Sequence, residues 1–537
     1  EPDMHKPLGD LDRLKVMLEK DWGWKDLLIA PHLIPQVQSL LRKGNWGVTA
    51  AIHRDMDSSR PFIVGLWPGL KNEAYGIACD IGSTTIAMHL VSLLSGRIVA
   101  SSGTSNPQIR FGEDLMSRVS YVMMNPDGRE AMTKAVREAV NSLIGKVCKE
   151  GEVDRHDILD MVFVANPIMH HLFLGIDPTE LGQAPFALAV SGALQYWAHD
   201  LDIDVNRGAR LYTLPCIAGH VGADAAGATL AEGPYRQDRM MLLVDVGTNA
   251  EIVLGNRNRV VAASSPTGPA FEGAEISSGQ RAAPGAIERV RIDPATLEPR
   301  FRVIGVDKWS DEEGFAEAAS GVGVTGICGS AIIEVVAEMY LSGIISEDGV
   351  VDGSMAERSA RILQNGRTFS YLLHDGEPRI TVTQNDIRAI QLAKSALYAG
   401  IKLLMEKQGV DHVDTIRFAG AFGSFIDPKY AMVLGLIPDC DLAEVKAVGN
   451  AAGTGALMAL LNRDHRREIE KEVARIEKIE TALEPNFQQL FVNAMAMPNK
   501  VDAFPELAKV VTLPERKVLS DDGGGEGGGR RRRRSRE

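Results

Sequence analysis

The 537-residue sequence is short of cysteine and aromatic residues, and it has no long uncharged apolar run. None of its five cysteines forms a C-x-x-C pair, so the sequence offers no zinc or iron–sulfur site and is typical of a reducing compartment. No stretch of about 18 residues is apolar throughout, which argues against a membrane-spanning helix. We therefore expect a cytoplasmic protein that does not enter a membrane.

Positive charge is also scarce, because the formal net charge is −13. This balance argues against general nucleic-acid binding. The exception is the C-terminal tail, where a glycine-rich stretch runs into the arginines of positions 530–534 and 536. We predict that residues 516–537 are disordered. The tail is then either a solvated segment or a docking arm for an acidic partner.

The commonest nucleotide-binding motif, G-x-x-x-x-G-K-[ST], is missing. Instead, two similar turns follow apolar strand-like runs: Asp80-Ile-Gly-Ser-Thr-Thr85 and Asp245-Val-Gly-Thr-Asn-Ala-Glu251. Glycine lets the backbone approach an anion, and successive N–H groups form an anion-binding concavity. An aspartate beside it can hold Mg²⁺, which bridges phosphate oxygens. The pair of turns predicts a clamp that holds the phosphates of a nucleotide from two sides.

The predicted site residues follow from these turns. Asp80 and Asp245 are the candidates for holding Mg²⁺ and for catalysis. The alternative for either aspartate is a turn-former that bonds its own backbone, but the matched pair favours the metal. The groups predicted to contact phosphate lie just past the aspartates: Gly82, Ser83, Thr84 and Thr85 in the first turn, and Gly247, Thr248 and Asn249 in the second.

Each turn opens one of two similar halves. We predict three strands over residues 74–81, 84–93 and 97–102 in the first half, and over 240–246, 250–254 and 259–263 in the second. Helices should follow, one begun by Asn125 as N-cap, one over residues 329–342, and a long one over 384–408 that Thr383 caps and Gly409 ends. The fold class is therefore α/β, with two duplicated lobes that face each other across a cleft.

This organisation predicts five segments. Residues 1–72 form a small α+β domain, with a helix near Leu11–Leu18, a short helix over Pro35–Leu41, and a hairpin of residues 47–53 and 61–67. Lobe 1 follows over 73–236 and lobe 2 over 237–464. A helical extension covers 465–515, and the tail covers 516–537.

The layout resembles the superfamily of sugar and acetate kinases, heat-shock chaperones and actin, over roughly residues 74–462. This resemblance implies actin-like (ribonuclease H-like) lobes and ATP in the cleft. A third glycine-rich segment of the superfamily holds adenosine, and Gly420, Gly423 and Ser424 match it here. Superfamily kinases often carry a catalytic aspartate in a stretch similar to the one around Asp224.

Two predictions at helix starts accompany the resemblance. Asp224 is either the catalytic aspartate, or the N-cap of a helix over residues 225–231, or both. Gly329 and Ser330 open another helix, and their amides are predicted to contact nucleotide phosphate.

Several further motifs are similar to those of the reductive activators of corrinoid proteins. They include Asn106-Pro-Gln-Ile-Arg-Phe-Gly-Glu-Asp114, Asn166-Pro-Ile-Met-His-His-Leu-Phe-Leu-Gly175 and Gly268-Pro-Ala-Phe-Glu-Gly-Ala274. The resemblance implies an ATPase that drives one-electron reduction of Co(II) corrinoid to Co(I) on the corrinoid protein of a methyltransferase system. A homodimer is a further expectation from the family.

The sequence departs from that family in one respect. Members usually carry an N-terminal ferredoxin-like domain with a [2Fe–2S] cluster, whose closely spaced cysteines are missing here. Either that domain lies upstream of this sequence, or a separate protein donates the electron. The chain is thus expected to bind nucleotide but not to transfer electrons. The alternative functions are a small-molecule kinase for a sugar or acyl substrate, and an actin-like scaffold.

Overall fold

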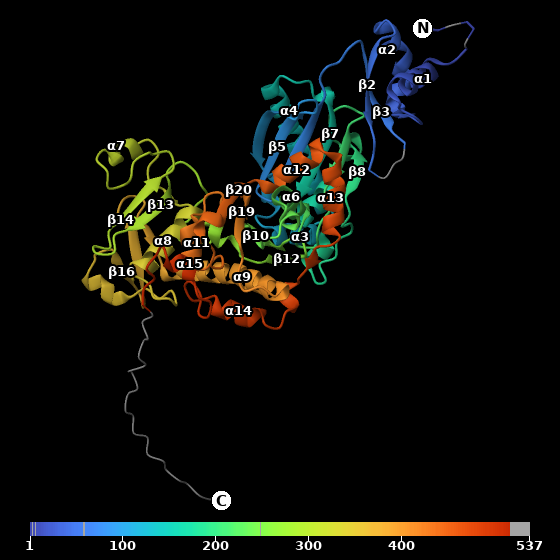
Figure 1. Ribbon diagram of the computed structural model, residues 1–537. Coiled ribbons are helices and arrows are strands. Elements are labelled where there is room, and N and C mark those ends of the chain that lie inside the picture. The colour runs from blue at the N-terminus through green and yellow to red at the C-terminus, as the bar shows by residue number, and fades with distance from the viewer. Residues whose placement is uncertain (3, 6, 57–59, 248, 516–537) are drawn as a thin grey trace, which may run out of the picture.

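The computed structural model describes residues 1–2, 4–5, 7–56, 60–247 and 249–515, as a small N-terminal unit beside a two-lobed body (Figure 1). The small unit contains α1 (Asp10–Trp22), β1 (Leu28–Ile29), a 3-10 helix (Pro31–Gln36), α2 (Val37–Lys43), β2 (Val48–His53) and β3 (Phe62–Pro68). The expected hairpin is confirmed, because β2 and β3 pair antiparallel. Leu14, Leu33 and Ile63 form part of the core of this unit.

Lobe 1 is built on a six-stranded sheet with the order β6-β5-β4-β7-β9-β8. Its strands are β4 (Tyr75–Ile81), β5 (Thr85–Ser92), β6 (Ile98–Ser105), β7 (Ile158–Ala165), β8 (Leu194–Trp197) and β9 (Arg210–Thr213). The first three strands form an antiparallel meander, and β7 continues the sheet parallel to β4. The helices α4 (Gly128–Gly151) and α5 (Pro167–Leu174) share a hydrophobic core with this sheet.

The prediction that Asn125 begins a helix was wrong. Asn125 is the C-cap of α3 (Leu115–Met124), and its backbone N–H donates to the Tyr121 carbonyl at 3.0 Å. This bond closes the last turn of α3, so α4 starts only at Gly128, with Asp127 as its N-cap.

Lobe 2 repeats the plan, with the strand order β20-β19-β10-β11-β12-β21. Its strands are β10 (Met241–Asp245), β11 (Ala250–Gly255), β12 (Val260–Ser265), β19 (Thr415–Ala419), β20 (Val445–Gly449) and β21 (Glu477–Lys478). An antiparallel meander is again followed by parallel strands, which confirms the duplicated α/β fold. The long helix α9 (Gln384–Gln408) has the predicted capping box of Thr383 and Asp386 and ends at Gly409 in the left-handed conformation.

Two helices cross between the lobes. One is α6 (Ala223–Glu232), and the other is α12 (Ala451–Leu461), which follows the last parallel strand of lobe 2 but packs on β4 and β7 of lobe 1. Their contact leaves no room for side chains, because a Cβ at Gly455 would lie 2.6 Å from the Gly227 Cα. The opposite side of α6 packs on the lobe 2 sheet through Ala225 and Ala228. The α6–α12 crossing is thus the buried connection between the two lobes.

The rest of the body is inserted between β12 and β19, lies between β19 and β20, or follows α12. The insert has two three-stranded sheets and helices α7 (Phe315–Ala319) and α8 (Gly329–Leu341); the strands are β13 (Ala286–Ile292), β14 (Pro299–Val303), β15 (Gly326–Ile327), β16 (Ile362–Asn365), β17 (Thr368–His374) and β18 (Ile380–Val382). The later helices are α10 (Gly420–Gly423), α11 (Pro428–Leu434), α13 (Arg463–Val473), α14 (Phe487–Asn493) and α15 (Pro505–Ala508).

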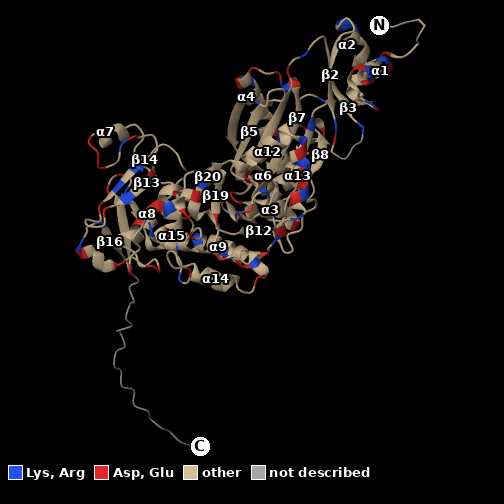
Figure 2. Cartoon of the chain, viewed as in Figure 1, with Lys and Arg blue, Asp and Glu red and all other residues tan. Residues whose placement is uncertain are grey.

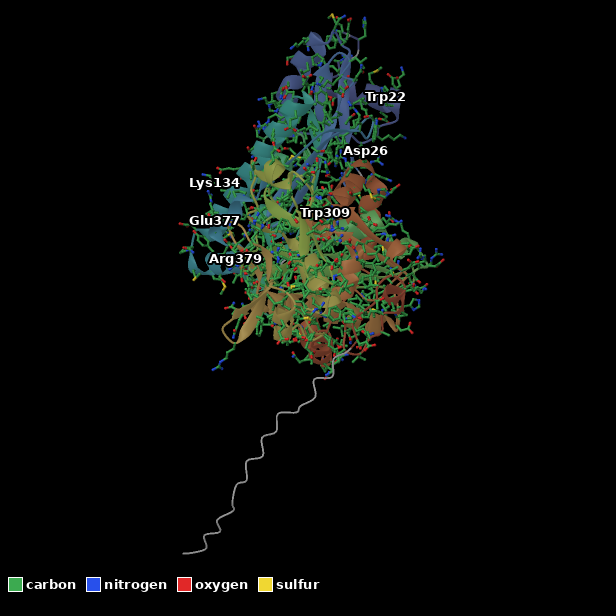
Figure 3. All side chains as sticks on the ribbon, turned by 90° about the vertical axis from the view of Figure 1, so that its left-hand side faces the viewer. Trp22, Asp26, Lys134, Trp309, Glu377 and Arg379 are labelled. Atoms are coloured by element: carbon green, nitrogen blue, oxygen red, sulfur yellow. The ribbon has the colours of Figure 1, made fainter. Side chains whose placement is uncertain are left out.

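Charged residues occur along the elements that cover the body. Figure 2 shows acidic and basic residues interspersed on α13, where Arg466 pairs with Asp160 of lobe 1 at 2.6 Å. Figure 3 shows Trp22 of the N-terminal unit well separated from Arg379 of the insert. Within the described ranges no helix has both the length and the apolar character needed to cross a membrane.

Candidate functional site

Four carboxylates interact where the two lobes face each other. Asp80 lies near the end of β4, Asp245 ends β10, and Asp224 lies in the first turn of α6. The fourth is Glu251, which lies directly across from Asp245 in the antiparallel register of β10 and β11. All four side chains are half-buried, so they remain accessible to a ligand.

The surrounding protein and the mutual repulsion of these carboxylates raise their pKa values. Burial raises the pKa of Asp80 to about 8, and the charges of Asp224 and Asp245 add to this shift. Burial also raises the pKa of Asp224 to about 7, against the hydrogen bond from the Ala225 N–H, and that of Asp245 to about 6. The pKa of Glu251 is raised well above its usual value by burial and by the same two neighbours. A cation in this cluster would displace protons.

Asn450, which follows β20 of lobe 2, joins the site opposite Asp80 of lobe 1. The hydrogen bond from its side chain to Asp80 opposes the rise in the pKa of that carboxyl without reversing it. The same side chain caps α12, because its oxygen accepts from the Gly453 N–H at 2.7 Å. Sequence reasoning missed Asn450 and gave no role to Glu251. An asparagine before an apolar helix is an N-cap signal, but it does not reveal a partner in the other lobe.

Hydrogen bonds from Asn106 fix the first predicted phosphate turn, residues 82–85. Asn106, the first residue after β6, donates its side-chain amide to the Gly82 carbonyl at 2.9 Å and its backbone N–H to the Thr84 carbonyl at 2.8 Å. The Gly82 N–H donates to the Thr85 carbonyl at 3.0 Å, which closes the turn. The carbonyl groups of Gly82 and Thr84 therefore point toward the buried Asn106. Ser83, between these two residues in the chain, is half-buried.

The second turn is also fixed by a hydrogen bond from a residue after the third strand of its lobe. Thr267, two residues after β12, donates its hydroxyl to the Gly247 carbonyl at 2.6 Å. Asn249 is half-buried just before β11, while Thr248 lies outside the described residues. The duplication therefore extends to a side chain after the third strand that bonds back to the glycine carbonyl of each turn.

The third glycine-rich segment lies against the second turn. Gly420 has φ of +82°, and a Cβ there would lie 3.3 Å from the Asp245 Cγ and nearer still to Oδ1. Only glycine combines this backbone conformation with so close an approach. Gly423 is buried near Phe418, and the exposed Ser424 donates its hydroxyl to the Gly420 carbonyl at 3.1 Å. This segment therefore shapes one wall of the carboxylate site.

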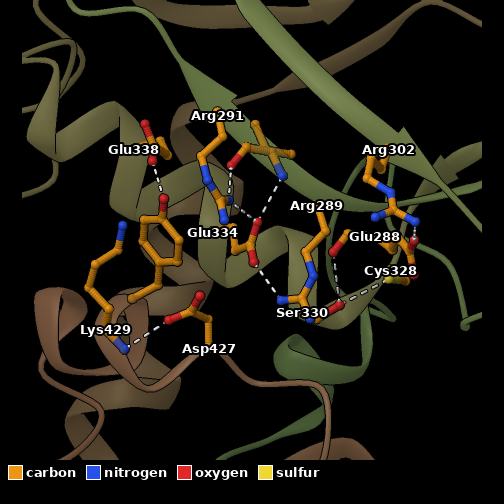
Figure 4. Close-up of polar contacts among 12 residues, drawn as sticks. Glu288, Arg289, Arg291, Arg302, Cys328, Ser330, Glu334, Glu338, Asp427 and Lys429 are labelled. Carbon is orange, nitrogen blue, oxygen red and sulfur yellow. Dashed lines mark hydrogen bonds and ion pairs between the residues drawn. The ribbon is translucent and has the colours of Figure 1, made fainter. Parts of the chain in front are cut away.

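The first residues of α8, Gly329 and Ser330, are buried. A Cβ at Gly329 would lie 2.5 Å from the Phe422 ring. The Ser330 hydroxyl donates to the Glu288 carbonyl at 3.2 Å, so this group is satisfied inside the protein (Figure 4). One turn later, Glu334 accepts hydrogen bonds from Arg289 and Arg291 at 2.7 and 2.6 Å and fixes β13 against α8. Gly329 therefore lies against Phe422 of the third segment.

The N-cap alternative for Asp224 was wrong. Gly222 occupies the N-cap position of α6, and Asp224 is the second residue of the helix. Its Oδ1 accepts from the Ala225 N–H at 2.8 Å. A Cβ at Gly222 would lie 2.5 Å from the Asp224 Oδ1, so glycine is needed for this arrangement.

The donor set suits Mg²⁺ bound together with phosphate. Within the described ranges, no three His, Cys, Asp or Glu side chains converge closely enough to hold a metal by themselves. Mg²⁺ in nucleotide sites commonly uses one or two carboxylates and completes its shell with water and phosphate oxygens. Asp80 and Asp245 fit that use. The five cysteines are all buried free thiols, and they include none of the grouped thiolates that a [2Fe–2S] cluster needs.

The chain matches known protein families, curated relatives and a solved structure. Three family models match successive parts of it: the RACo linker region over 1–73, the RACo middle region over 75–237, and the C-terminal ASKHA domain of RACo over 239–508. The corrinoid activation enzyme RamQ of Eubacterium limosum is 33% identical over 431 residues, which are 78% of this chain and 69% of RamQ.

A second curated relative is the [Co(II) methylated amine-specific corrinoid protein] reductase of Methanosarcina barkeri. It is 24% identical over 392 residues, which are 68% of this chain and 66% of the reductase. Among solved structures, a reductive activator for corrinoid, iron–sulfur protein matches with a TM-score of 0.79 and 31% identity. The match covers 93% of this chain and 78% of that protein.

Proposed function

Since this chain belongs to the RACo family of reductive activators of corrinoid proteins, we propose that it is an ATPase that drives reduction of a Co(II) corrinoid to Co(I) on a methyltransferase corrinoid protein. The observation that carries the proposal is the meeting of Asp80 and Asp245, one from each lobe, beside Asp224. A ligand that binds all three must bridge the lobes. Mg·ATP is such a ligand, because its phosphate tail suits the two turns and its metal suits the carboxylates.

In this proposal each group has a defined role. The turns after Asp80 and Asp245 hold the phosphates through backbone N–H groups, and the third segment at Gly420 accommodates the adenosine. Mg²⁺, held by Asp80 and Asp245 directly or through water, would neutralise the phosphate charge. Asp224 orients the attacking water and accepts its proton, because it lies beside the two carboxylates assigned to the metal.

The coupling to the corrinoid partner would use the lobe connection. A nucleotide held by both turns favours the closed cleft, and the movement is transmitted through the α6–α12 crossing and the Asn450–Asp80 bond. Such a movement acts on a partner only if the partner binds the open and closed forms with different affinity. The electron would come from a [2Fe–2S] domain or from a separate donor protein, because the described cysteines are dispersed. A homodimer belongs to the same proposal.

The test combines the chain with a Co(II) corrinoid protein, a [2Fe–2S] electron donor and a low-potential reductant. Mg·ATP should increase the rate at which the Co(I) absorption band appears. Asp80→Ala and Asp245→Ala should each abolish the ATP effect, whereas Glu138→Gln, on the exposed face of α4, should not. An unchanged rate with ATP would refute the activator function, and stoichiometric phosphorylation of a sugar or acyl acid would support the kinase alternative.

A further inference from the structure

A fully buried arginine lies directly behind the first phosphate turn. Arg118 lies in α3 and is 0% exposed. Its guanidinium donates from Nη2 to the Ser83 carbonyl at 2.7 Å, from Nε to the Gly112 carbonyl at 2.9 Å, and from Nη1 to the Met169 sulfur at 3.2 Å. It therefore links α3 and the segment before it to the turn that follows Asp80.

This guanidinium carries a charge without a close counter-ion. Burial lowers the pKa of Arg118 to about 10, so the side chain is still protonated at neutral pH. Asp114 acts on it only from a distance; its side chain instead caps α3 by accepting from the Ser117 N–H at 2.8 Å. No carboxylate in the described part of the chain forms an ion pair with Arg118. A buried charge without a counter-ion is unfavourable, so negative charge on the outer side of the turn would be favoured.

The hydrogen bonds to the carbonyls also set the direction of the amides. In a trans peptide the C=O and the following N–H point in opposite directions. Arg118 holds the Ser83 carbonyl inward, which turns the Thr84 N–H outward, and Asn106 does the same for the Gly82 carbonyl and the Ser83 N–H. Neither N–H donates to a protein group within the described residues. Two successive outward N–H groups are the arrangement that binds an anion.

We propose that Arg118 is a positioning residue for nucleotide phosphate: it aims the amides of the first turn and supplies the positive charge behind them. This inference rests on the proposed function and adds a residue to its site. It also accounts for the segment Asn106–Asp114, since that segment supplies Asn106, the Gly112 carbonyl and the cap of the helix that carries Arg118.

The experiment measures the dissociation constants of Mg·ATP and adenosine by calorimetry or displacement, with the melting temperature of each variant. Arg118→Gln should weaken Mg·ATP at least tenfold and change adenosine by less than twofold. Arg118→Lys, which keeps the charge, should recover part of the ATP affinity. Arg466→Gln is the matched control, because Arg466 is also buried but pairs with Asp160 away from the turn. It should lower the melting temperature and leave both dissociation constants unchanged.

The possible outcomes are distinct. If Arg118→Gln binds Mg·ATP as the wild type does, or loses ATP and adenosine affinity equally, the inference fails. If Arg118→Gln does not fold, the decision passes to Arg118→Lys and Asn106→Ala. Either of these should weaken ATP more than adenosine, and a uniform loss in both overturns the inference. If the wild-type chain binds no Mg·ATP, it is the proposed function that fails.

Discussion

Replacing Gly420 by alanine tests whether the third segment and Asp245 form one site. The φ of +82° puts alanine in the left-handed region, at a cost of roughly 1–2 kcal/mol. The new Cβ would also lie 3.3 Å from the Asp245 Cγ and closer to Oδ1, so the carboxylate must rotate away. Because Asp245 is assigned to Mg²⁺, we expect Gly420→Ala to weaken Mg·ATP at least tenfold, or about 1.4 kcal/mol, and to abolish ATP-dependent Co(I) formation.

The matched control is Gly409→Ala. Gly409 has φ of +71° at the end of α9, and a Cβ there would meet nothing within 4 Å. This variant has the same kind of backbone strain without displacing a carboxylate. Both variants should therefore lose melting temperature, but only Gly420→Ala should lose ATP affinity. If calorimetry gives Gly420→Ala a wild-type dissociation constant, the assignment of Asp245 to this site is refuted.

Three further predictions concern the carboxylate site and the connection between the lobes. The raised pKa values of Asp80 and Asp224 mean that the folded protein binds more protons than the unfolded chain between about pH 4 and 8, so the melting temperature without ligand should fall as pH rises through this range. An Asp80→Asn variant that keeps the wild-type slope would contradict this. Removing Mg²⁺ with EDTA should weaken ATP binding at least tenfold in calorimetry, and equal affinity with and without the metal would count against a metal site. Gly455→Ala should destabilise the protein by about 1–3 kcal/mol in urea unfolding because its Cβ meets the Gly227 backbone, whereas Gly145→Ala in α4, which meets only the tip of a side chain, should be neutral or stabilising.

Much of the fold followed from local patterns. The two strand meanders, the α9 capping box at Thr383 and the end of that helix at Gly409 all depend on residues within a few positions of one another. The errors were also local, but they arose where two capping residues competed. Asn125 looks like a helix start, yet its N–H closes the preceding helix. Asp224 looks like a cap, yet Gly222 takes that position.

The sequence by itself determined the chemistry of each half, because an aspartate, a glycine and the turn that joins two strands are neighbours in the chain. Only the tertiary structure decided which distant groups complete the site. Asn450 reaches Asp80 at the start of a helix that crosses to the other lobe, and Arg118 is buried behind Ser83, whereas Glu251 faces Asp245 across a local hairpin. These contacts join residues that lie far apart in the sequence or on different elements. Their energies depend on packing, and no local pattern records that packing.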